Sequence, residues 1–356
     1  MNIPFAASIP YFFYFYFLAI LIFFKKIKSK NQILFLLFIV FLIVFIFYEG
    51  NYSDWRTYRA FVKTCTCIGC TYFEPLYDLL TYVSSQTIGF KLIPLVSLFL
   101  LFYFFVILKK YVLNSNMYVI LILSISMAYL PLYYGALRQS IAFSILLFSL
   151  LSLQNKTYFT SFILFLLATG FHLSSIVIYF LVIVYFTLWK ISNKNFFKFI
   201  FLIITSFILG FFILKQLMPY LSVIDSFNPG FKNATPNPLK LILLPLERFM
   251  ILIFAFYTLF YNKNNRIIEY LSIISIIGSI FYLVMYKFSL NTAGRVVVFF
   301  RLADIFVIYY FIKIFVQKRY FELNYKETLN NIALFCILIY SIVKFYFTII
   351  SVGFFR

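Results

Sequence analysis

Long apolar runs follow one another along most of the chain, and short polar turns separate them. Each run approaches the ~20 residues that cross the hydrocarbon core of a bilayer as a helix, and we count about twelve of them. They lie at residues 11–24, 33–47, 92–108, 118–132, 140–153, 158–171, 175–188, 199–217, 241–261, 267–286, 296–316 and 329–350. The pattern predicts an all-α polytopic membrane protein, one integral membrane domain over residues 1–356, because helices satisfy backbone polar groups in lipid.

The turns between the runs alternate in charge. The densest lysine cluster, Lys25 to Lys30, follows the first run, and lysines recur at every second turn. The positive-inside rule makes these turns cytoplasmic and both chain ends external. The run at 11–24 is then expected to be an anchor and not a cleaved signal. Residues 48–91 and 218–240 become long external loops, the first containing surface helices and the second irregular.

Composition agrees with this class and narrows the partners. The chain is 64% hydrophobic and 11% charged, with a formal net charge of +20. Such a basic excess can indicate nucleic acid, but here the lysines sit in short clusters between spans and build no basic face on a soluble domain. Membrane lipid is therefore an expected partner, and nucleic acid is not.

A predicted helical hairpin brings two functional candidates together. The runs at 140–153 and 158–171 are joined by the short turn Gln154-Asn155-Lys156, so both helices cross and return to one face. Arg138 precedes the first helix, and His172, the only histidine, follows the second. Charged residues beside membrane spans mark functional sites by default. The alternative for His172 is an interfacial histidine with a satisfied hydrogen bond.

The arginines are distributed between the two sides of the membrane differently from the lysines. Most of them fall on the outer half of the predicted topology: Arg56, Arg59, Arg138, Arg248, Arg295, Arg301 and Arg356. The planar guanidinium binds phosphate oxygens in pairs, so an arginine-lined outer cavity suits a phosphorylated ligand. The candidate diphosphate ligands are Arg138, Arg295, Arg301 and Arg248.

Some of these charges have a structural alternative. Glu247 with Arg248, and Arg301 with Asp304, can form ion pairs within one helix, since buried charges usually pair. If the helix begins at residue 296, Arg301 lies roughly 8 Å below its outer end.

The chain carries no signature of a resident cofactor. It lacks a Walker loop, a dinucleotide-binding glycine fingerprint, a nucleophile elbow and a His-Glu metal helix. We expect no cofactor and no metal, so the energy for a reaction must arrive with the substrate. A polyprenyl-diphosphate-linked sugar carries its own leaving group, whose charge arginines would stabilise, while apolar helices would hold the prenyl tail.

Three of the four cysteines lie close together, at Cys65, Cys67 and Cys70. A zinc site needs four ligands, and no further Cys or His lies nearby. One local disulfide or free thiols on an external loop is the favoured interpretation.

Four short motifs resemble the EpsG-type branch of the Wzy class of bacterial polysaccharide polymerases. They are Asp54-x-x-x-Tyr58, Glu74-Pro75, Arg138-Gln139 and Phe171-His172-x-Ser174, and they occur in an order and on a predicted side similar to the family's. The chain departs from the family pattern in the position of Gly50, four residues before Asp54, and in the segment from Cys65 to Cys70.

The resemblance implies a glycosyltransferase of the bacterial inner membrane that joins lipid-linked repeat units on the periplasmic face. It implies polyprenyl-diphosphate-linked oligosaccharides as substrates and O-antigen, capsule or exopolysaccharide as product. A chain-length regulator and a flippase of the same pathway are the expected protein partners. His172, Asp54 or Glu74 would activate the acceptor hydroxyl.

Two rival functions remain open at this point. A lipid-linked glycan flippase should carry charges on both halves of its cavity, because the head group crosses the membrane. A glycosyltransferase that uses a polyprenyl-monophosphate sugar would fit the same outer site.

Overall fold

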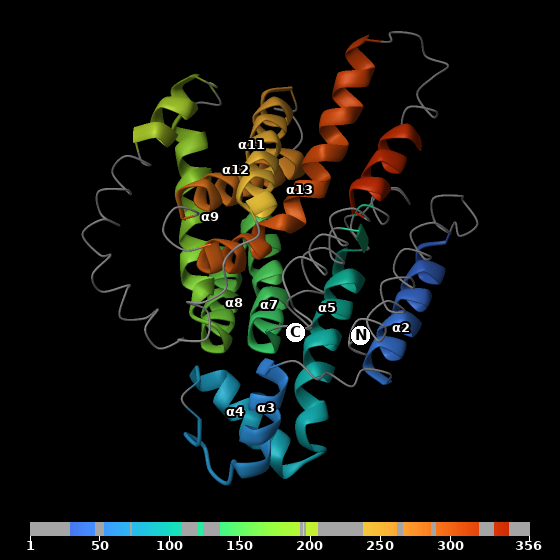
Figure 1. The fold of residues 1–356 in the computed structure, drawn as a ribbon, viewed down its shortest axis with the longest axis vertical. Coiled ribbons are helices and arrows are strands. Elements are labelled where there is room, and N and C mark those ends of the chain that lie inside the picture. The colour runs from blue at the N-terminus through green and yellow to red at the C-terminus, as the bar shows by residue number, and fades with distance from the viewer. Residues whose placement is uncertain are drawn as a thin grey trace.

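The computed structural model describes residues 29–46, 53–71, 73–108, 120, 122–123, 136–192, 195, 197–205, 238–261, 266–285, 290–319 and 331–341. Every regular element among them is a helix, and no strand occurs in this part of the chain (Figure 1). The elements are α2 (Lys30–Ile46), α3 (Ser53–Thr64), α4 (Pro75–Gln86), the 3₁₀ helix η1 (Gly89–Lys91), α5 (Leu92–Leu108), α7 (Leu137–Gln154), α8 (Tyr158–Phe171), α9 (Ser174–Ile191), α11 (Pro238–Tyr261), α12 (Arg266–Met285) and α13 (Leu290–Arg319). Shorter helices cover residues 197–205 and Asn331–Ser341. The predicted all-helical class is confirmed for these residues.

Within the described residues, four helical segments are long and apolar enough to cross a membrane: Gly89–Ile107, Leu137–Gln154, Ser174–Ile191 and Ile242–Tyr261. Further apolar helices, including α8, are shorter. The membrane class is therefore supported by length and composition, and the total of about twelve spans stays a prediction. The predicted run at 11–24, most of those at 118–132 and 199–217, and the loop at 218–237 lie outside the described residues.

Two helices extend beyond the apolar runs that predicted them. α11 begins at Pro238, where the fixed φ of proline suits a first helical position. α13 begins at Leu290, so Asn291 and Thr292 belong to its first turn, ahead of the predicted apolar run. Arg301 therefore lies roughly 16 Å from the start of its helix at 1.5 Å per residue, about twice the depth expected from sequence.

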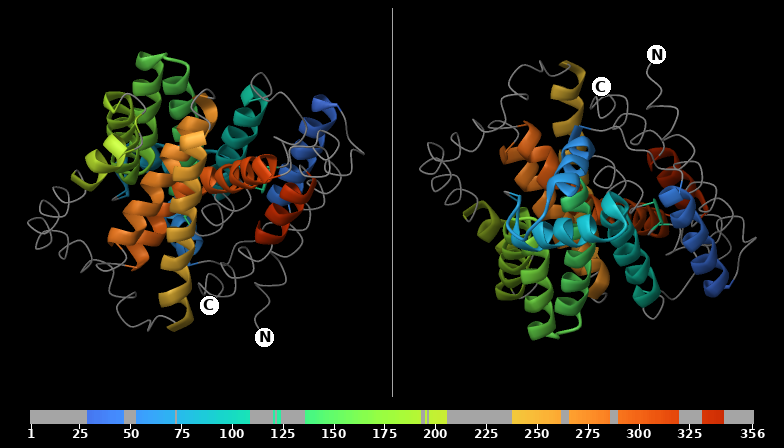
Figure 2. Two further views of the ribbon diagram at one scale, coloured as in Figure 1. Left: turned by 90° about the horizontal axis from the view of Figure 1, so that it is seen from above. Right: turned by 90° about the horizontal axis from the view of Figure 1, so that it is seen from below.

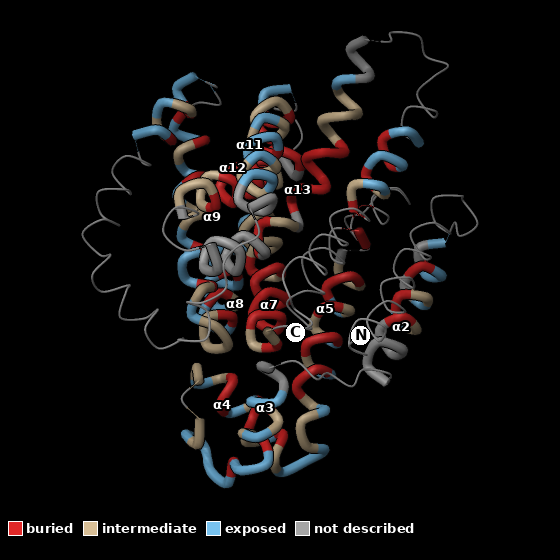
Figure 3. The backbone as a smooth tube through the Cα atoms, viewed as in Figure 1, coloured by how far each residue is buried: buried red, intermediate tan, exposed pale blue. Residues whose placement is uncertain are grey.

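Helices α7 and α12 are the most deeply buried, whereas α8 and α9 expose apolar residues on their outer faces (Figure 3). Hydrogen bonds of hydroxyl groups connect α7, α8 and α9. Ser149 of α7 donates to the carbonyl of Ser161 in α8 at 2.7 Å, and the Ser161 hydroxyl lies 2.9 Å from that of Tyr179 in α9. Seen from above and below, α2 and the helix 331–341 lie on the side of the molecule away from α8 and α9 (Figure 2).

Helices α12 and α13 approach closely at a glycine. A Cβ at Gly278 would lie 2.3 Å from Cβ of Phe300, so any side chain there would force the two helices apart. This contact places α13 directly beside the deeply buried α12.

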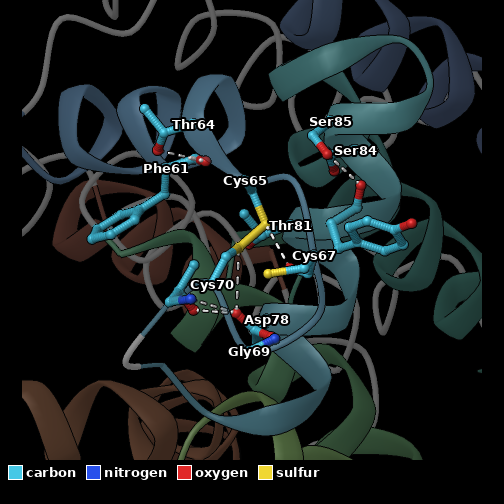
Figure 4. Close-up of a disulfide and its surroundings, with 12 residues drawn as sticks. Phe61, Thr64, Cys65, Cys67, Gly69, Cys70, Asp78, Thr81, Ser84 and Ser85 are labelled. Carbon is cyan, nitrogen blue, oxygen red and sulfur yellow. Dashed lines mark hydrogen bonds between the residues drawn. A yellow bond between two sulfur atoms is a disulfide. The ribbon is translucent and has the colours of Figure 1, made fainter.

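The predicted external loop at 48–91 is mostly helical in the structure. α3 and α4 pack against each other at one end of the molecule, drawn at the bottom of Figure 1, and α4 also contacts α5 and α8. Cys65 and Cys70 form a disulfide in the segment that joins α3 to α4, and Cys67 is free and exposed (Figure 4). The local disulfide favoured from sequence is therefore present.

Asp78 of α4 anchors this disulfide segment. Its carboxylate accepts hydrogen bonds from the backbone N–H of Gly69 at 2.5 Å, and from the N–H and hydroxyl of Thr71 at 2.9 and 2.6 Å (Figure 4). Burial would raise the pKa of Asp78, but these hydrogen bonds outweigh it and lower the pKa. The charged carboxylate therefore holds the segment to the first turn of α4.

Candidate functional site

Glu74, the residue immediately before α4, lies at the centre of the site. It precedes Pro75, and its backbone is extended (φ −61°, ψ 147°), as expected for a residue before proline. The Glu74 side chain does not cap its own helix. Its carboxylate instead reaches the α7–α8 hairpin, where Oε2 lies 2.6 Å from Nη1 of Arg138 and Oε1 lies 3.0 Å from Nδ1 of His172.

The α7–α8 hairpin supplies the two partners of Glu74 from neighbouring helix ends. Arg138 is the second residue of α7, and His172 directly follows α8. The backbone N–H of Leu173 also donates to Glu74 Oε1, at 3.2 Å. Arg138 and His172 lie at the same end of the hairpin, as predicted, and Glu74 joins them. The side of the membrane that they face stays a prediction.

Close packing of α4 on α8 holds Glu74 in place. A Cβ at Gly170, two residues before His172, would lie 2.6 Å from Cδ1 of Leu76, two residues after Glu74. Glycine at this position lets the two segments approach until the carboxylate and the imidazole are in hydrogen-bonding distance.

Aromatic rings fix the guanidinium of Arg138. Its Nε donates to the hydroxyl of Tyr58 in α3 at 3.3 Å. The guanidinium carbon lies 4.2 Å from the ring centroid of Phe73 and 5.9 Å from that of Tyr77. These cation–π contacts and the Glu74 ion pair restrict Arg138 to one orientation, while its side chain keeps 23% of its exposure.

Gln139 is also a site residue. It belongs to the predicted Arg138-Gln139 motif, but the sequence alone assigned it no role. Its amide nitrogen Nε2 lies 2.8 Å from Nε2 of His172. Consecutive helical residues project about 100° apart, so Arg138 and Gln139 reach Glu74 and His172 from two sides. The signal available in the sequence was its position next to Arg138.

The charge of Glu74 is strongly stabilised. Burial would raise the pKa of its carboxyl, but the hydrogen bond from His172 and the charge of Arg138 together lower that pKa to about 2. Glu74 is therefore ionised throughout the physiological range. At neutral pH it is a weak proton acceptor, and a fixed anion that orients its two partners.

The pKa shift predicts how acid acts on this site. The folded pKa of about 2 lies below the ordinary value of 4.5, so ionised Glu74 stabilises the fold above about pH 4.5, and this contribution is lost as the pH falls toward 2. Its ceiling is on the order of 3 kcal/mol. In detergent, Glu74→Gln should unfold at a lower temperature than wild type at pH 7, and the difference should shrink at pH 3. An equal difference at both pH values would contradict the assigned ion pair.

Of the other predicted site residues, Arg248 and Arg301 lie in a second cluster. Asp54 lies in α3 and Arg295 in α13, but their side chains are outside the described part of the structure. Arg248 of α11 forms an ion pair with Asp304 of α13, with Nη1 2.6 Å from Oδ2 and side-chain exposures of 2% and 3%. The close partner of Arg248 therefore comes from another helix, and Glu247 beside it lies farther away, at 3.7 Å.

Further hydroxyl groups complete this second, buried cluster. Ser275 of α12 donates to Asp304 at 2.7 Å, and Tyr340 donates to Glu247 at 2.6 Å. Nε of Arg301 is buried there, with no hydrogen-bond partner among the described residues. The ring of Phe143 in α7 contacts that of Phe299 in α13, at 5.6 Å between centroids, so the helix that carries Arg138 packs on the helix that carries Asp304.

A match along most of the chain establishes the family. The model of the EpsG family matches residues 32–355, a range that contains Glu74, Arg138, Gln139 and His172. The chain belongs to the EpsG family. A search of curated proteins and a search of solved structures each find no match. EpsG membership, together with the apolar helices, indicates a membrane protein of polysaccharide biosynthesis and confirms the resemblance drawn from the motifs.

Proposed function

We propose that this EpsG-family protein is an inner-membrane polysaccharide polymerase. It would join polyprenyl-diphosphate-linked oligosaccharide repeat units on the periplasmic face, making O-antigen, capsule or exopolysaccharide. The observation that carries the proposal is the Glu74–Arg138–His172 cluster, a fixed anion, cation and imidazole at the ends of apolar helices. The neighbouring Cys65–Cys70 disulfide supports the external side, because disulfides persist in oxidising compartments.

The proposed reaction is a glycosyl transfer with the diphosphate as leaving group. The acceptor hydroxyl oxygen bonds to the anomeric carbon of the growing chain, and the bond from that carbon to the diphosphate oxygen breaks. The polyprenyl diphosphate leaves with the electron pair, and the hydroxyl proton passes to Nε2 of His172. Glu74 accepts a hydrogen bond from Nδ1–H of His172 and stabilises the imidazolium that forms, as an orienting carboxylate does in a catalytic triad.

The arginines would bind the diphosphate with unequal ease. Arg138 is accessible and fixed by Glu74 and by the Phe73 ring, so its fork is already oriented. The buried Nε of Arg301 would gain an acceptor from a phosphate oxygen. Arg248 would contribute only if its pair with Asp304 opened. Arg295 and Asp54 stay in the proposal on their sequence positions alone.

Exposed apolar side chains on the helices suit the prenyl tail and membrane lipid. Phe159 of α8 is 79% exposed and Phe180 of α9 is 54% exposed. Large apolar patches of this kind mark contact with lipid or another apolar partner.

Glycan from a deletion strain tests the function. We expect single repeat units attached to lipid on the periplasmic side, and polymer restored by the wild-type gene. Units trapped on the cytoplasmic face would indicate a flippase instead.

With purified enzyme and lipid-linked repeat units, His172→Gln should turn over at least tenfold more slowly, a loss of about 1.4 kcal/mol in transition-state stabilisation. Near-normal turnover would pass the base role to Asp54 and leave His172 as structure.

The exposed thiol of Cys67 tests the proposed side of the membrane. Cys336 is the other free cysteine within the described residues, so a Cys336→Ser variant makes Cys67 the main target. A membrane-impermeant maleimide should label it in cells whose inner membrane is intact, and Cys67→Ser should abolish the label. Labelling that requires opening of the inner membrane would reverse the topology and remove the basis for an external site.

A further inference from the structure

The contact with the amide of Gln139 requires an Nε2 atom without a proton on the ring of His172. Gln139 lies in the first turn of α7 and is only 7% exposed, with its amide nitrogen 2.8 Å from Nε2 of the imidazole. An amide nitrogen only donates hydrogen bonds, and a neutral imidazole nitrogen accepts one only where it carries no proton.

The other ring nitrogen completes the argument. Nδ1 of His172 lies 3.0 Å from Oε1 of Glu74, an ionised carboxylate that only accepts hydrogen bonds. Nδ1 must therefore carry the proton, and Nε2 of the neutral ring presents its lone pair to Gln139. The two contacts are consistent with one tautomer of the neutral imidazole and with no other arrangement of its proton.

We propose that Gln139 is a positioning residue that holds Nε2 of His172 as a proton acceptor and yields its place to the acceptor hydroxyl. The N–H of Gln139 occupies the position from which a substrate O–H would donate to Nε2. When the amide rotates away, the hydroxyl replaces it, and the ring already has the correct tautomer. The tautomer follows from the contacts alone, whereas the displacement by a hydroxyl rests on the proposed function.

The groups around His172 include two opposite charges. Glu74 faces it from α4 and Arg138 from α7, and these opposite charges form an ion pair with each other. The hydroxyl of Tyr58 and the ring of Tyr77 both contact Arg138. α9 begins at Ser174 and offers only hydroxyl groups in its first turn. A second proton on His172 would place an N–H against the N–H of Gln139.

A single histidine makes the tautomer directly measurable. The chain contains one histidine, so full-length protein labelled with ¹⁵N-histidine, and purified through a tag without histidine, reports His172 alone by NMR. At pH 8 we expect a proton on Nδ1 and none on Nε2. Gln139→Glu, which replaces the donor by an acceptor, should protonate both nitrogens. Gln139→Met, of similar size, should keep the proton on Nδ1, because Glu74 still accepts its hydrogen bond, and should leave Nε2 without a donor. A proton on Nε2 of the wild-type ring would overturn the proposal.

Turnover tests the displacement separately. With lipid-linked repeat units, Gln139→Glu should lower kcat at least tenfold at pH 7 and recover as the pH rises, because the second ring proton must leave before His172 can accept another. Gln139→Met should lower kcat without this pH dependence. If the tautomers are as expected and neither variant changes kcat, the positioning role is wrong while the polymerase remains. If wild-type protein makes no polymer, the proposed function fails, and the NMR result still decides the tautomer.

Discussion

Replacing Arg138 by lysine is expected to lower polymer formation at least ~100-fold while protein level stays near that of wild type. Lysine keeps the positive charge but offers a point charge in place of a planar fork. It cannot reproduce both the 2.6 Å bond to Glu74 and the 3.3 Å bond to Tyr58, and it loses the guanidinium stacking 4.2 Å above Phe73. A diphosphate would then meet a mobile ammonium instead of an oriented pair of donors.

Polymer length on gels and protein level by immunoblot measure this effect in a complemented deletion strain. Arg59→Lys is a matched control from the neighbouring α3, because Arg59 stacks over Phe90 at 5.4 Å, away from the carboxylate of Glu74. It should support normal polymer. Arg295→Lys should lose polymer as Arg138→Lys does, if both bind the diphosphate. Full-length polymer from Arg138→Lys would remove Arg138 from the proposed site.

Elements with strong local signals could be predicted from the sequence. The run at 92–108 matches α5, and the hairpin from α7 to α8 follows from two apolar runs and one polar turn. Its consequence, that Arg138 and His172 share a face, needs only chain connectivity. Local pattern is sufficient here because hydrophobic length decides where a helix crosses lipid.

Contacts between distant segments could not be predicted in this way. Glu74 was one of two candidate acids, and nothing local shows that it meets Arg138, 64 residues later in the chain. The pairing of Arg248 with Asp304 depends on which helices are neighbours, which hydrophobic pattern does not encode. α12 packs against both α11 and α13, and its close approach to α13 at Gly278 is visible only in three dimensions.

Breaking the Arg248–Asp304 pair from one side is expected to cost about 3–5 kcal/mol of stability. In Arg248→Met the carboxylate of Asp304 stays buried, with Ser275 as its remaining close donor. Asp304→Leu leaves the guanidinium of Arg248 with Glu247 at 3.7 Å as its nearest acid. Both single variants should show a lower unfolding temperature in detergent and a lower level in membranes.

The double variant separates a structural role from a substrate role. Arg248→Met with Asp304→Leu removes both charges and fills the space with apolar groups, which is often neutral or stabilising for a buried pair. We therefore expect the double variant to recover the unfolding temperature lost in each single variant. Because Arg248 is 2% exposed and held by Asp304, we also expect the double variant to make polymer.

Arg301 completes the test, because it shares the buried cluster but has an Nε without a hydrogen-bond partner in the described structure. Replacing it by glutamine removes a charge that forms no ion pair with a carboxylate of the described residues, so stability should change little. If Arg301 binds the diphosphate, Arg301→Gln should instead raise KM for lipid-linked repeat units, by at least about tenfold for one charge-assisted bond. A stable double variant without polymer, beside an unaffected Arg301→Gln, would assign the diphosphate to Arg248 and require its pair with Asp304 to open during the reaction.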